Sequence, residues 1–447
     1  MPKSKTNYSC TNCGANYGSW SGKCASCGEW NTLEEQVVVA PTRGKTARGT
    51  ALKSEKLSPL LKETETRLQT DTTEIDTVLG GGFVKGSVVL LAGEPGIGKS
   101  TLLMQIAYAI SQNVPVLYVS GEESVVQVAN RARRLNAINE DINLSASSSA
   151  NDIAAAIASS QYKLVIVDSI QTVSCQEISS AAGTMSQITH STQLLTAAAK
   201  ESNTTLIIVG HVTKEGAIAG PKLLEHSVDV VLQLEGDRFG GFKLLRAVKN
   251  RYGATHEVGI FEMSELGLQA VDNPSKALLA ERQITDGSVV LATMEGTRSI
   301  LVEIQALVNR SSFGYPKRTA SGFDVNRLNL LVAMLEKRTK LQLSDKDIYI
   351  NVVGGIRLTE PAADLAICMA IGSAAKGMSL VKNAVIFGEV GLSGELRHVP
   401  FAEKRIEEAG RIGFDAAIGP KTLGSKKLPK FYEPQLDVRS ALNNYLK

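Results

Sequence analysis

The run Gly93-Glu94-Pro95-Gly96-Ile97-Gly98-Lys99-Ser100-Thr101 constrains the fold of this chain more than any other segment. It fits the pattern G-x-x-x-x-G-K-[ST], in which glycines let backbone N–H groups close around phosphate oxygens. An apolar stretch at 86–92 precedes it, and Leu102, Ile106 and Ile110 follow at helical spacing. A strand, a glycine loop and a helix N-terminus in this order form an anion site. The segment therefore predicts a nucleoside triphosphate site.

Side chains of this loop supply the expected chemistry. Lys99 would neutralise the β- and γ-phosphates, and the Ser100 hydroxyl would bind Mg²⁺. Asp168 ends the apolar stretch 164–168 and suits a residue that holds Mg²⁺ through water. The predicted cofactor-binding residues are thus Gly93, Glu94, Pro95, Gly96, Ile97, Gly98, Lys99, Ser100, Thr101 and Asp168, with ATP and Mg²⁺ as cofactors.

Residues 61–270 alternate apolar strands with helical patterns, which predicts an α/β fold with a parallel sheet covered on both faces. The ligand of such a sheet lies beyond the carboxyl ends of the strands. Glu122 follows one of them and could activate the attacking water. His211 follows another and could donate a hydrogen bond to the γ-phosphate. Alternatively, Glu122 and Glu123 merely favour the N-terminus of the next helix. Candidate strands are Ser87–Ala92, Val114–Val119, Leu164–Val167 and Thr205–Val209.

A basic, strand-like segment covers residues 241–253. In an extended chain Lys243, Lys249 and Arg251 share one face, although surface strands often carry such charges without any ligand. The loop Val212–Glu225 before it could couple nucleotide state to something held in the centre of an assembly. It carries Lys214, Gly216, Gly220 and Lys222.

Two cysteine pairs, Cys10-x-x-Cys13 and Cys24-x-x-Cys27, predict a zinc-binding module over residues 1–35. Each turn aims two sulfurs at one ion, and four sulfurs complete a tetrahedral shell for Zn²⁺. Because all four ligands are protein groups, the site is expected to be structural. A redox dithiol is the alternative, but it needs one pair only.

The remaining cysteines and the tryptophans are expected to be structural. Cys175 and Cys368 stand alone and are interpreted as buried thiols. Trp20 and Trp30 could pack on the metal turns or offer a stacking surface for a base or a partner, and packing is favoured. Residues 36–60 form a linker whose basic side chains are interpreted as solvated.

The composition shifts at about residue 275, where a second α/β pattern begins. Leu330, Leu331, Met334 and Leu335 form an apolar helical stripe, interpreted as core. Strands are predicted at Asp347–Val353 and Ala384–Gly388. Arg310, Lys317, Arg318 and Arg327 flank a loop with Gly314 and Pro316 and could contact phosphates without sequence preference.

Together, these motifs resemble the bacterial RadA family, within the RecA/DnaB class of ATPases. The supporting segments are the four zinc-module cysteines, Asp76-x-x-Leu79-Gly-Gly-Gly82, the phosphate loop, Tyr118-Val-Ser-Gly-Glu-Glu-Ser124, Val167-Asp168-Ser169, Gly210-His211 and Lys249-Asn250-Arg251-Tyr252-Gly253. The last corresponds to the family signature K-N-R-F-G, with tyrosine in place of phenylalanine.

This resemblance implies a homohexameric ring with ATP at the subunit boundaries. It implies that Lys249 and Arg251 act on the nucleotide of a neighbouring subunit, so that hydrolysis depends on assembly. It also implies an ATP-driven helicase or branch-migration factor on single-stranded and branched DNA, with a RecA-type recombinase as a partner.

The half of the chain over residues 275–447 resembles the proteolytic domain of Lon proteases. The resemblance rests on Asn351-Val-Val-Gly-Gly-Ile-Arg357, Pro361-Ala-Ala-Asp-Leu-Ala366 and Phe387-Gly-Glu-Val-Gly-Leu-Ser-Gly-Glu-Leu-Arg397. Lon proteases use a serine activated by a lysine, but residues 354–369 contain no serine, and the lysine position falls near Ala402, two residues from Lys404. Without a hydroxyl nucleophile that mechanism cannot run. The half is therefore expected to be an inactive scaffold, although Thr359 lies nearby.

Composition limits the classes of function only weakly. The net charge of +3 does not by itself indicate nucleic acid, and no apolar run reaches the roughly 18 residues of a membrane span. We expect a cytoplasmic location and no membrane partner. Two other functions remain open: an ATP-dependent Lon-like peptidase, and a signalling ATPase of the KaiC kind that phosphorylates itself.

Overall fold

The computed structural model describes residues 5–10, 16–38, 66–211, 222–236, 241–311, 314–421 and 429–446. The chain divides into two units, 1–64 and 65–447. Cys13, much of the linker and the loop 212–221 lie outside the described residues. Within the described part, every helix is too short or too polar to span a bilayer.

The first unit is a small antiparallel sheet in the order β2-β1-β3. Its strands are β1 (Lys5–Cys10), β2 (Asn16–Tyr17) and β3 (Leu33–Val38). Its apolar core holds only a few side chains, among them Cys10, Cys24 and Leu33. So little buried apolar surface leaves a bound metal to supply most of the folding free energy.

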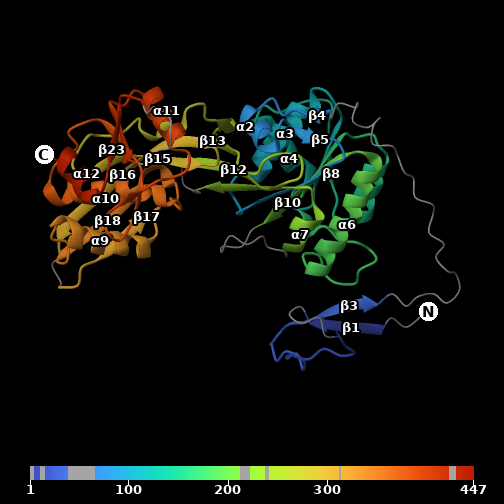
Figure 1. The fold of residues 1–447 in the computed structure, drawn as a ribbon. Coiled ribbons are helices and arrows are strands. Elements are labelled where there is room, and N and C mark those ends of the chain that lie inside the picture. The colour runs from blue at the N-terminus through green and yellow to red at the C-terminus, as the bar shows by residue number, and fades with distance from the viewer. Residues whose placement is uncertain are drawn as a thin grey trace, which may run out of the picture. The chain divides into compact units, whose positions relative to one another are not determined.

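The second unit begins with a sheet of nine strands (Figure 1). Their order is β14 (Gly267–Ala270), β13 (Val258–Ser264), β12 (Phe242–Asn250), β11 (Val230–Gly236), β6 (Val88–Gly93), β10 (Thr205–His211), β9 (Leu164–Asp168), β7 (Val116–Ser120) and β8 (Ile142–Ala146). The six strands from β11 to β8 are parallel, and β12, β13 and β14 extend the sheet in antiparallel fashion. The predicted parallel sheet is thus confirmed.

Helices cover both faces of this sheet, because its central strands bury alternate residues in two separate cores. Val89 and Leu91 of β6 lie in one core with α3, whereas Val88 and Leu90 lie in the other with α6. The helices are α2 (Thr73–Leu79), α3 (Lys99–Ser111), α4 (Val125–Arg134), α5 (Ala150–Ala158), η1 (Ile170–Thr172), α6 (Met185–Ser202) and α7 (Lys222–Ser227), and a short ribbon joins β4 (Arg67–Leu68) to β5 (Phe83–Val84).

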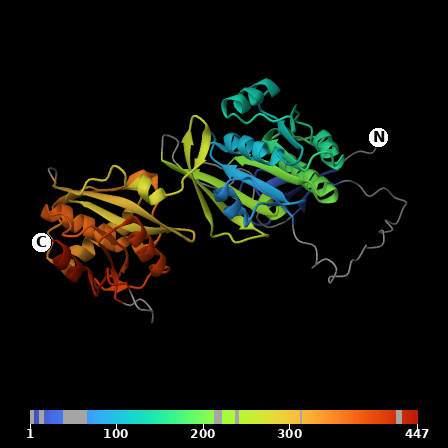
Figure 2. The same cartoon turned by 90° about the horizontal axis from the view of Figure 1, so that it is seen from above.

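A second sheet of seven strands follows, with its helices in orange and red in Figure 2. Its order is β17 (Arg318–Ser321), β18 (Lys346–Val352), β16 (Arg298–Arg310), β15 (Ser288–Glu295), β19 (Ala384–Ile386), β22 (Ala416–Pro420) and β23 (Tyr432–Gln435). The helices are α8 (Pro274–Leu278), α9 (Val325–Thr339), α10 (Asp364–Lys376), α11 (Ala402–Ile412) and α12 (Val438–Tyr445), with η2 (Val353–Gly355), η3 (Pro361–Ala363) and the ribbon β20 (Glu389–Val390) to β21 (Leu396–Arg397).

The apolar stripe predicted on α9 is correct except at one position. Leu331, Met334 and Leu335 are buried in the core of this half, whereas Leu330 is 48% exposed. Leu330 lies at the margin of the stripe, where the helix surface turns towards solvent. The two lone cysteines, Cys175 and Cys368, are buried free thiols, as expected.

Candidate nucleotide and metal sites

The strand order gathers the predicted nucleotide-site residues at one edge of the nine-stranded sheet. Gly93 ends β6, and His211, at the end of the neighbouring β10, is its register partner. Asp168 ends β9 and is the register partner of Ser120, which ends β7 two residues before Glu122. All four strands are parallel, so their carboxyl ends meet where ligands of such sheets bind. Only the backbone of His211 is described.

The phosphate loop turns directly into helix α3. Gly98 is the N-cap of α3 at φ 116°, a left-handed conformation that glycine adopts readily. A Cβ atom at this position would also lie 2.7 Å from the Met263 side chain. Lys99 folds back over the loop, where its Nζ donates to the carbonyl oxygens of Gly93 and Glu94 at 2.8 and 3.0 Å.

Lys99 lies in an environment suited to an anion. Its side chain is buried, and burial lowers its pKa, while the negative charges of Asp168 and Glu122 oppose that shift. The three residues are therefore close enough to influence one another. Phosphate oxygens beside Lys99 would favour its charged form further.

Each carboxylate near the loop has a distinct hydrogen-bond partner. The Tyr118 hydroxyl donates to Asp168 Oδ2 at 2.6 Å, and the Ser169 hydroxyl donates to Glu122 Oε1. Glu123 instead forms an ion pair with Arg131 of α4 at 2.6 Å. Glu122 and Glu123 thus have different partners. Glu122 is held by Ser169, which directly follows the strand that carries Asp168.

Sequence reasoning assigned no role to Tyr118 or Ser169. Tyr118 lies in β7 and is 1% exposed, and burial raises the pKa of its hydroxyl, so it remains a donor at neutral pH. Ser169 directly follows Asp168 in the sequence. This position next to a predicted Mg²⁺ ligand was the sequence signal that could have identified Ser169. Both side chains hold a carboxylate in place, which is a positioning role.

Lys249 and Arg251 lie at the opposite edge of the sheet. β12 runs antiparallel to β11, so its last residue, Asn250, pairs with Val230 at the amino end of β11. The backbone N–H of Arg251 donates to the Asp229 carbonyl, and that of Asp229 donates to the Val88 carbonyl at the start of β6.

β6 runs from this edge, where the parallel strands begin, to the phosphate loop, so its length gives the distance between the two. This strand has six residues from Val88 to Gly93, which is about 16 Å at about 3.3 Å per residue. Lys249 and Arg251 therefore do not reach the phosphate loop of their own subunit.

The expectation that Lys243, Lys249 and Arg251 share one face is wrong for Lys243. The register shifts by a bulge between Val231 and Leu232, so that Lys243 and Ala247 face one core and Lys249 faces the other. A bulge adds one residue and reverses the alternation beyond it. Lys243 is accordingly 4% exposed.

The cation pair has well-defined surroundings. Lys249 Nζ donates to the carbonyl oxygens of Glu225 and Val228 at 2.6 and 2.7 Å. Burial and the charge of Arg251 both lower its pKa. Arg251 contacts Asp229 Oδ1 at 3.4 Å, and its side chain is 58% exposed. Two neighbouring cations, one of them directed to solvent, are suited to bind an anion from outside the subunit.

Two signature segments meet beside this pair. Asn250 Nδ2 donates to the carbonyls of Val78 and Leu79 at the end of α2, at 3.4 Å each, and its Oδ1 accepts from the N–H of Tyr252 at 2.9 Å. The backbones approach so closely that a Cβ on Gly253 would lie 3.3 Å from Gly80 Cα. The glycines and Asn250 thus fix the backbone conformation at Arg251.

The three described cysteines of the first unit form a metal-binding cluster. The Sγ atoms of Cys10, Cys24 and Cys27 all lie within 4.8 Å of one another, and those of Cys10 and Cys27 are 3.7 Å apart. Ligands of a tetrahedral Zn²⁺ with bonds of about 2.3 Å lie about 3.8 Å apart. A hydrogen bond from the Tyr17 hydroxyl lowers the pKa of Cys24 to about 6, which favours the thiolate that binds metal. The cluster fits Zn²⁺.

Replacing Cys27 by serine is expected to release the metal. A hydroxyl is a much weaker ligand for Zn²⁺ than a thiolate, and this unit has little apolar core to hold it folded. Atomic absorption of the purified variant should show zinc well below one ion per chain. Cys175→Ser, at a buried thiol elsewhere in the chain, is the matched control and should retain zinc. Full zinc content in Cys27→Ser would contradict the assignment.

Known protein families resemble three separate parts of this chain. Family models match in three places: "AAA domain" at residues 54–217, "Rubredoxin metal binding domain" at 8–35, and "Subunit ChlI of Mg-chelatase" at 327–422. A crystal structure of the RadB recombinase aligns with 46% of this chain and all of that chain, at 23% identity and a TM-score of 0.37.

Curated relatives match over nearly the whole chain. The DNA repair protein RadA of Pseudomonas aeruginosa is 46% identical over 96% of both chains. That of Bacillus subtilis is 48% identical over 94% of this chain and 93% of its own. For Escherichia coli the identity is 42% over 95% of both. The chain belongs to the RadA family. The resemblance found in the motifs is thereby confirmed, as is the fold class: a RecA-like core between a zinc module and a Lon-like domain.

In this RadA-family chain, an ion pair joins the two segments that resemble the serine and lysine segments of Lon proteases. Ala362, in the first segment, and Ala402, near the expected lysine position, are 1% and 5% exposed. Arg405 of α11 is fully buried and donates to both carboxylate oxygens of Glu360 and to the Ala292 carbonyl. Glu360 also accepts from the Thr293 hydroxyl. The pair joins the two segments that carry the alanines.

Replacing Arg405 by alanine is expected to destabilise the Lon-like half by about 3–5 kcal/mol, because Glu360 loses its partner and a cavity remains. Urea unfolding followed by circular dichroism measures this loss. The matched control is Arg397→Ala, which removes an ion pair with Glu395 in which both side chains are at least 40% exposed. That change should cost no more than about 1 kcal/mol. Equal losses in both variants would contradict a structural role for Arg405.

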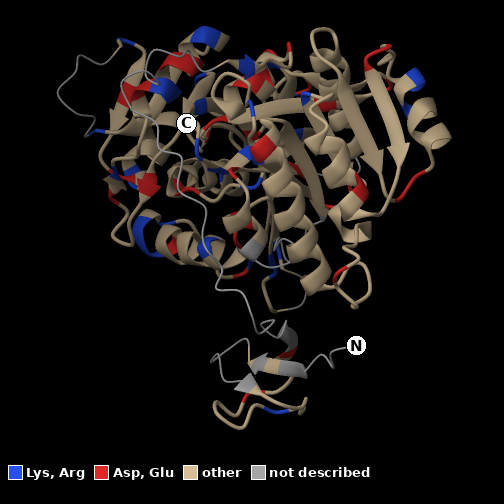
Figure 3. Ribbon diagram, turned by 90° about the vertical axis from the view of Figure 1, so that its right-hand side faces the viewer, with Lys and Arg blue, Asp and Glu red and all other residues tan. Residues whose placement is uncertain are grey.

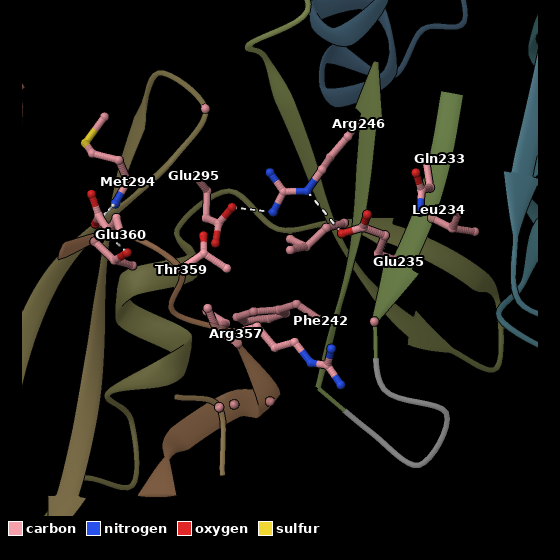
Figure 4. A pocket seen from close by; sticks show the side chains of 18 of the residues that line it. Gln233, Leu234, Glu235, Phe242, Arg246, Met294, Glu295, Arg357, Thr359 and Glu360 are labelled. Carbon is pink, nitrogen blue, oxygen red and sulfur yellow. Dashed lines mark hydrogen bonds and ion pairs between the residues drawn. The ribbon is translucent and has the colours of Figure 1, made fainter. Parts of the chain in front are cut away.

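A cavity of about 1070 Å³ lies beside the phosphate loop (Figure 4). It meets the loop through Glu94 and Ile97, and neither Lys99 nor Asp168 lines it, so it is not the phosphate site itself. On its wall, Arg246 of β12 forms ion pairs with Glu235 and with Glu295 of β15. Arg246 thereby connects the nine-stranded sheet to the seven-stranded sheet.

Proposed function

We propose that this chain is a DNA-dependent ATPase that works as a motor: a homohexameric ring that moves on single-stranded and branched DNA and helps extend recombination intermediates. The observation that carries the proposal is the separation of two parts of one active site. The phosphate loop lies at one edge of the sheet, and the cations Lys249 and Arg251 lie at the other. A complete site then forms only where two subunits meet.

Within one subunit, the phosphate-loop edge binds and orients the nucleotide. The backbone N–H groups of residues 96–101, which follow Pro95, surround the phosphates, and Lys99 neutralises them. Ser100 and Asp168 offer the oxygen ligands that Mg²⁺ prefers. Glu122, oriented by Ser169, accepts a proton from the attacking water. His211, at the end of β10, donates to the γ-phosphate.

The neighbouring subunit completes the charge compensation. Arg251 carries its guanidinium into solvent, and Lys249 stands beside it on β12. A cation supplied in trans stabilises the charge on the phosphoryl group being transferred. Hydrolysis at each boundary therefore depends on the position of the next subunit, which is the requirement for a ring motor.

Single-stranded DNA is proposed as the substrate because the relatives are named DNA repair proteins. In the Lon-like half, the Arg310 side chain is 84% exposed and lies 3.8 Å from Asp345 Oδ2, and Lys317 and Arg318 follow it in the sequence. Arg327 was expected to join them, but it forms a two-bond ion pair with buried Asp364 instead. We assign the remaining three residues to phosphate contacts and Arg327 to its ion pair with Asp364. A RecA-type recombinase is the proposed protein partner.

The Lon-like half is proposed to be a scaffold without peptidase activity. Residues 354–369 contain no serine, Ala402 stands near the expected lysine position, and the Arg405–Glu360 ion pair joins the two segments. Thr359, the nearby hydroxyl, lines the cavity beside the phosphate loop. No described feature favours the peptidase or the self-phosphorylating ATPase over the motor.

Single-stranded DNA is expected to raise ATP turnover at least several-fold. Phosphate contacts by lysine and arginine release counterions, so the DNA concentration for half-maximal stimulation should rise steeply with salt. Steady-state turnover with oligothymidylate across a salt series measures both effects. Duplex DNA of equal phosphate content is the matched control and should stimulate less. Turnover that is unaffected by single-stranded DNA at every salt concentration would contradict the proposed function.

A further inference from the structure

The zinc module exposes both tryptophans of the chain. Trp20 and Trp30 are 58% and 68% exposed, although packing against the metal turns was expected. Large aromatic side chains seldom remain this exposed, because burying one stabilises a fold by about 2–3 kcal/mol. Their exposure therefore indicates a surface for another molecule.

Both indoles lie close to the same glycine. A Cβ atom on Gly22 would lie 3.7 Å from Cζ3 of Trp30 and 3.9 Å from Cη2 of Trp20. A side chain at position 22 would therefore contact both rings. The segment is held by the bridge between Lys23 and Trp30 and by the hydrogen bond from the Asn31 N–H to the Gly22 carbonyl, at 2.9 Å. Trp30 thus has a fixed backbone.

Small and polar residues surround the rings. Among residues 17–34, whose side chains the structure describes, the exposed large apolar side chains are these two alone. The described module carries few charged residues (Figure 3). One of them, the Lys23 ammonium, lies 5.5 Å from the centroid of the Trp30 ring.

The size of this apolar surface discriminates between partners. A stable protein interface buries about 800 Å² per partner around an apolar core, and two indoles in polar surroundings supply only a fraction of that. The surface does match one or two nucleobases, which stack on aromatic side chains with about 1–3 kcal/mol each.

We propose that Trp20 and Trp30 form a stacking site for bases of single-stranded DNA. The inference rests on the proposed function, since it takes DNA as the substrate. It adds a second contact with the strand, on the zinc module. Because this contact uses base faces instead of phosphates, it requires bases but no particular sequence, and it contributes little to the salt dependence of binding.

Tryptophan fluorescence of the full chain reports this surface alone, because the chain has no other tryptophan. An oligothymidylate is expected to quench the fluorescence, whereas an abasic strand of equal length, with the same phosphates, should leave it unchanged. Binding of both strands is followed in parallel by anisotropy of an end label. If the labelled oligothymidylate binds without quenching, or if the abasic strand quenches equally, the stacking site is wrong. If neither strand binds, the proposed function itself fails.

Substitutions provide the second test. Trp30→Ala should weaken oligothymidylate binding about tenfold by anisotropy, with an unchanged salt slope, whereas Trp30→Phe, which keeps an aromatic face, should retain most of the affinity. Zinc content should equal that of the parent in both, because both indoles are exposed. A Trp30→Ala variant that binds DNA like the parent would overturn the proposal. Loss of recombinase binding in that variant, with DNA binding intact, would assign the surface to a protein partner.

Discussion

Lys99→Ala is expected to reduce ATP turnover by about a hundredfold to a thousandfold and to weaken nucleotide binding. The Lys99 ammonium lies at the phosphate loop beside the negative charges of Asp168 and Glu122. Without it, the phosphates meet those carboxylates with no compensating charge, and removal of one such stabilising group typically costs two to three orders of magnitude in rate. Phosphate release and binding of a fluorescent ATP analogue measure the two effects.

The matched control for this variant is Lys163→Ala. Lys163 lies just before β9 and donates to the Ser160 carbonyl at 3.4 Å, away from the phosphate loop. Its loss removes the same charge from the chain and should leave turnover within about twofold of the parent, as for most surface substitutions. If Lys99→Ala still hydrolyses ATP at the parental rate while Lys163→Ala behaves normally, the nucleotide site is elsewhere.

Arg251→Ala is expected to leave ATP binding nearly intact and to slow turnover by about a thousandfold or more. The binding residues lie at the other edge of the sheet, about 16 Å away along β6, and remain untouched. An arginine supplied to a transferring phosphoryl group typically contributes a factor of about 10³ to 10⁵ in rate. Binding of the ATP analogue and phosphate release separate these two outcomes. Arg439→Ala, which removes an exposed arginine from α12, is the matched control.

A mixing experiment distinguishes action within a subunit from action between subunits. In a mixed ring, a boundary can combine the phosphate loop of an Arg251→Ala subunit with the arginine of a Lys99→Ala subunit. Two inactive variants should then recover part of the parental turnover when mixed and reassembled. If Arg251 served its own subunit, every site in the mixture would lack one of the two groups, and no recovery would occur.

Local motifs could be interpreted from the sequence because their chemistry depends on neighbouring residues. The phosphate loop needs a strand, glycines and a helix in immediate succession, and residues 86–111 contain all three. The paired cysteines follow the same logic: the turn between Cys24 and Cys27 brings both sulfurs to one side, and the cluster with Cys10 forms as predicted. The roles of Glu122, His211, Lys249 and Arg251 remain predictions.

Side-chain positions that depend on strand register were harder to predict from the sequence. The bulge opposite Val231 turns Lys243 into the core, and alternation along an unbroken strand could not reveal it. Arg327 resembled a surface cation until the fold placed Asp364 beside it. The exposure of Trp20 and Trp30 likewise became evident only in the tertiary structure, where their side chains are 58% and 68% exposed.

By itself, the sequence determined the fold class and predicted the phosphate loop and the metal ligands, because each is encoded by neighbouring residues whose spacing sets their geometry. The tertiary structure alone decided which side chains hold the carboxylates, that Arg405 pairs with Glu360 in the Lon-like half, and that Arg251 lies at the far edge from the phosphate loop. These features join residues distant in the chain, and their geometry arises from strand order and register, which the packing of the whole domain selects.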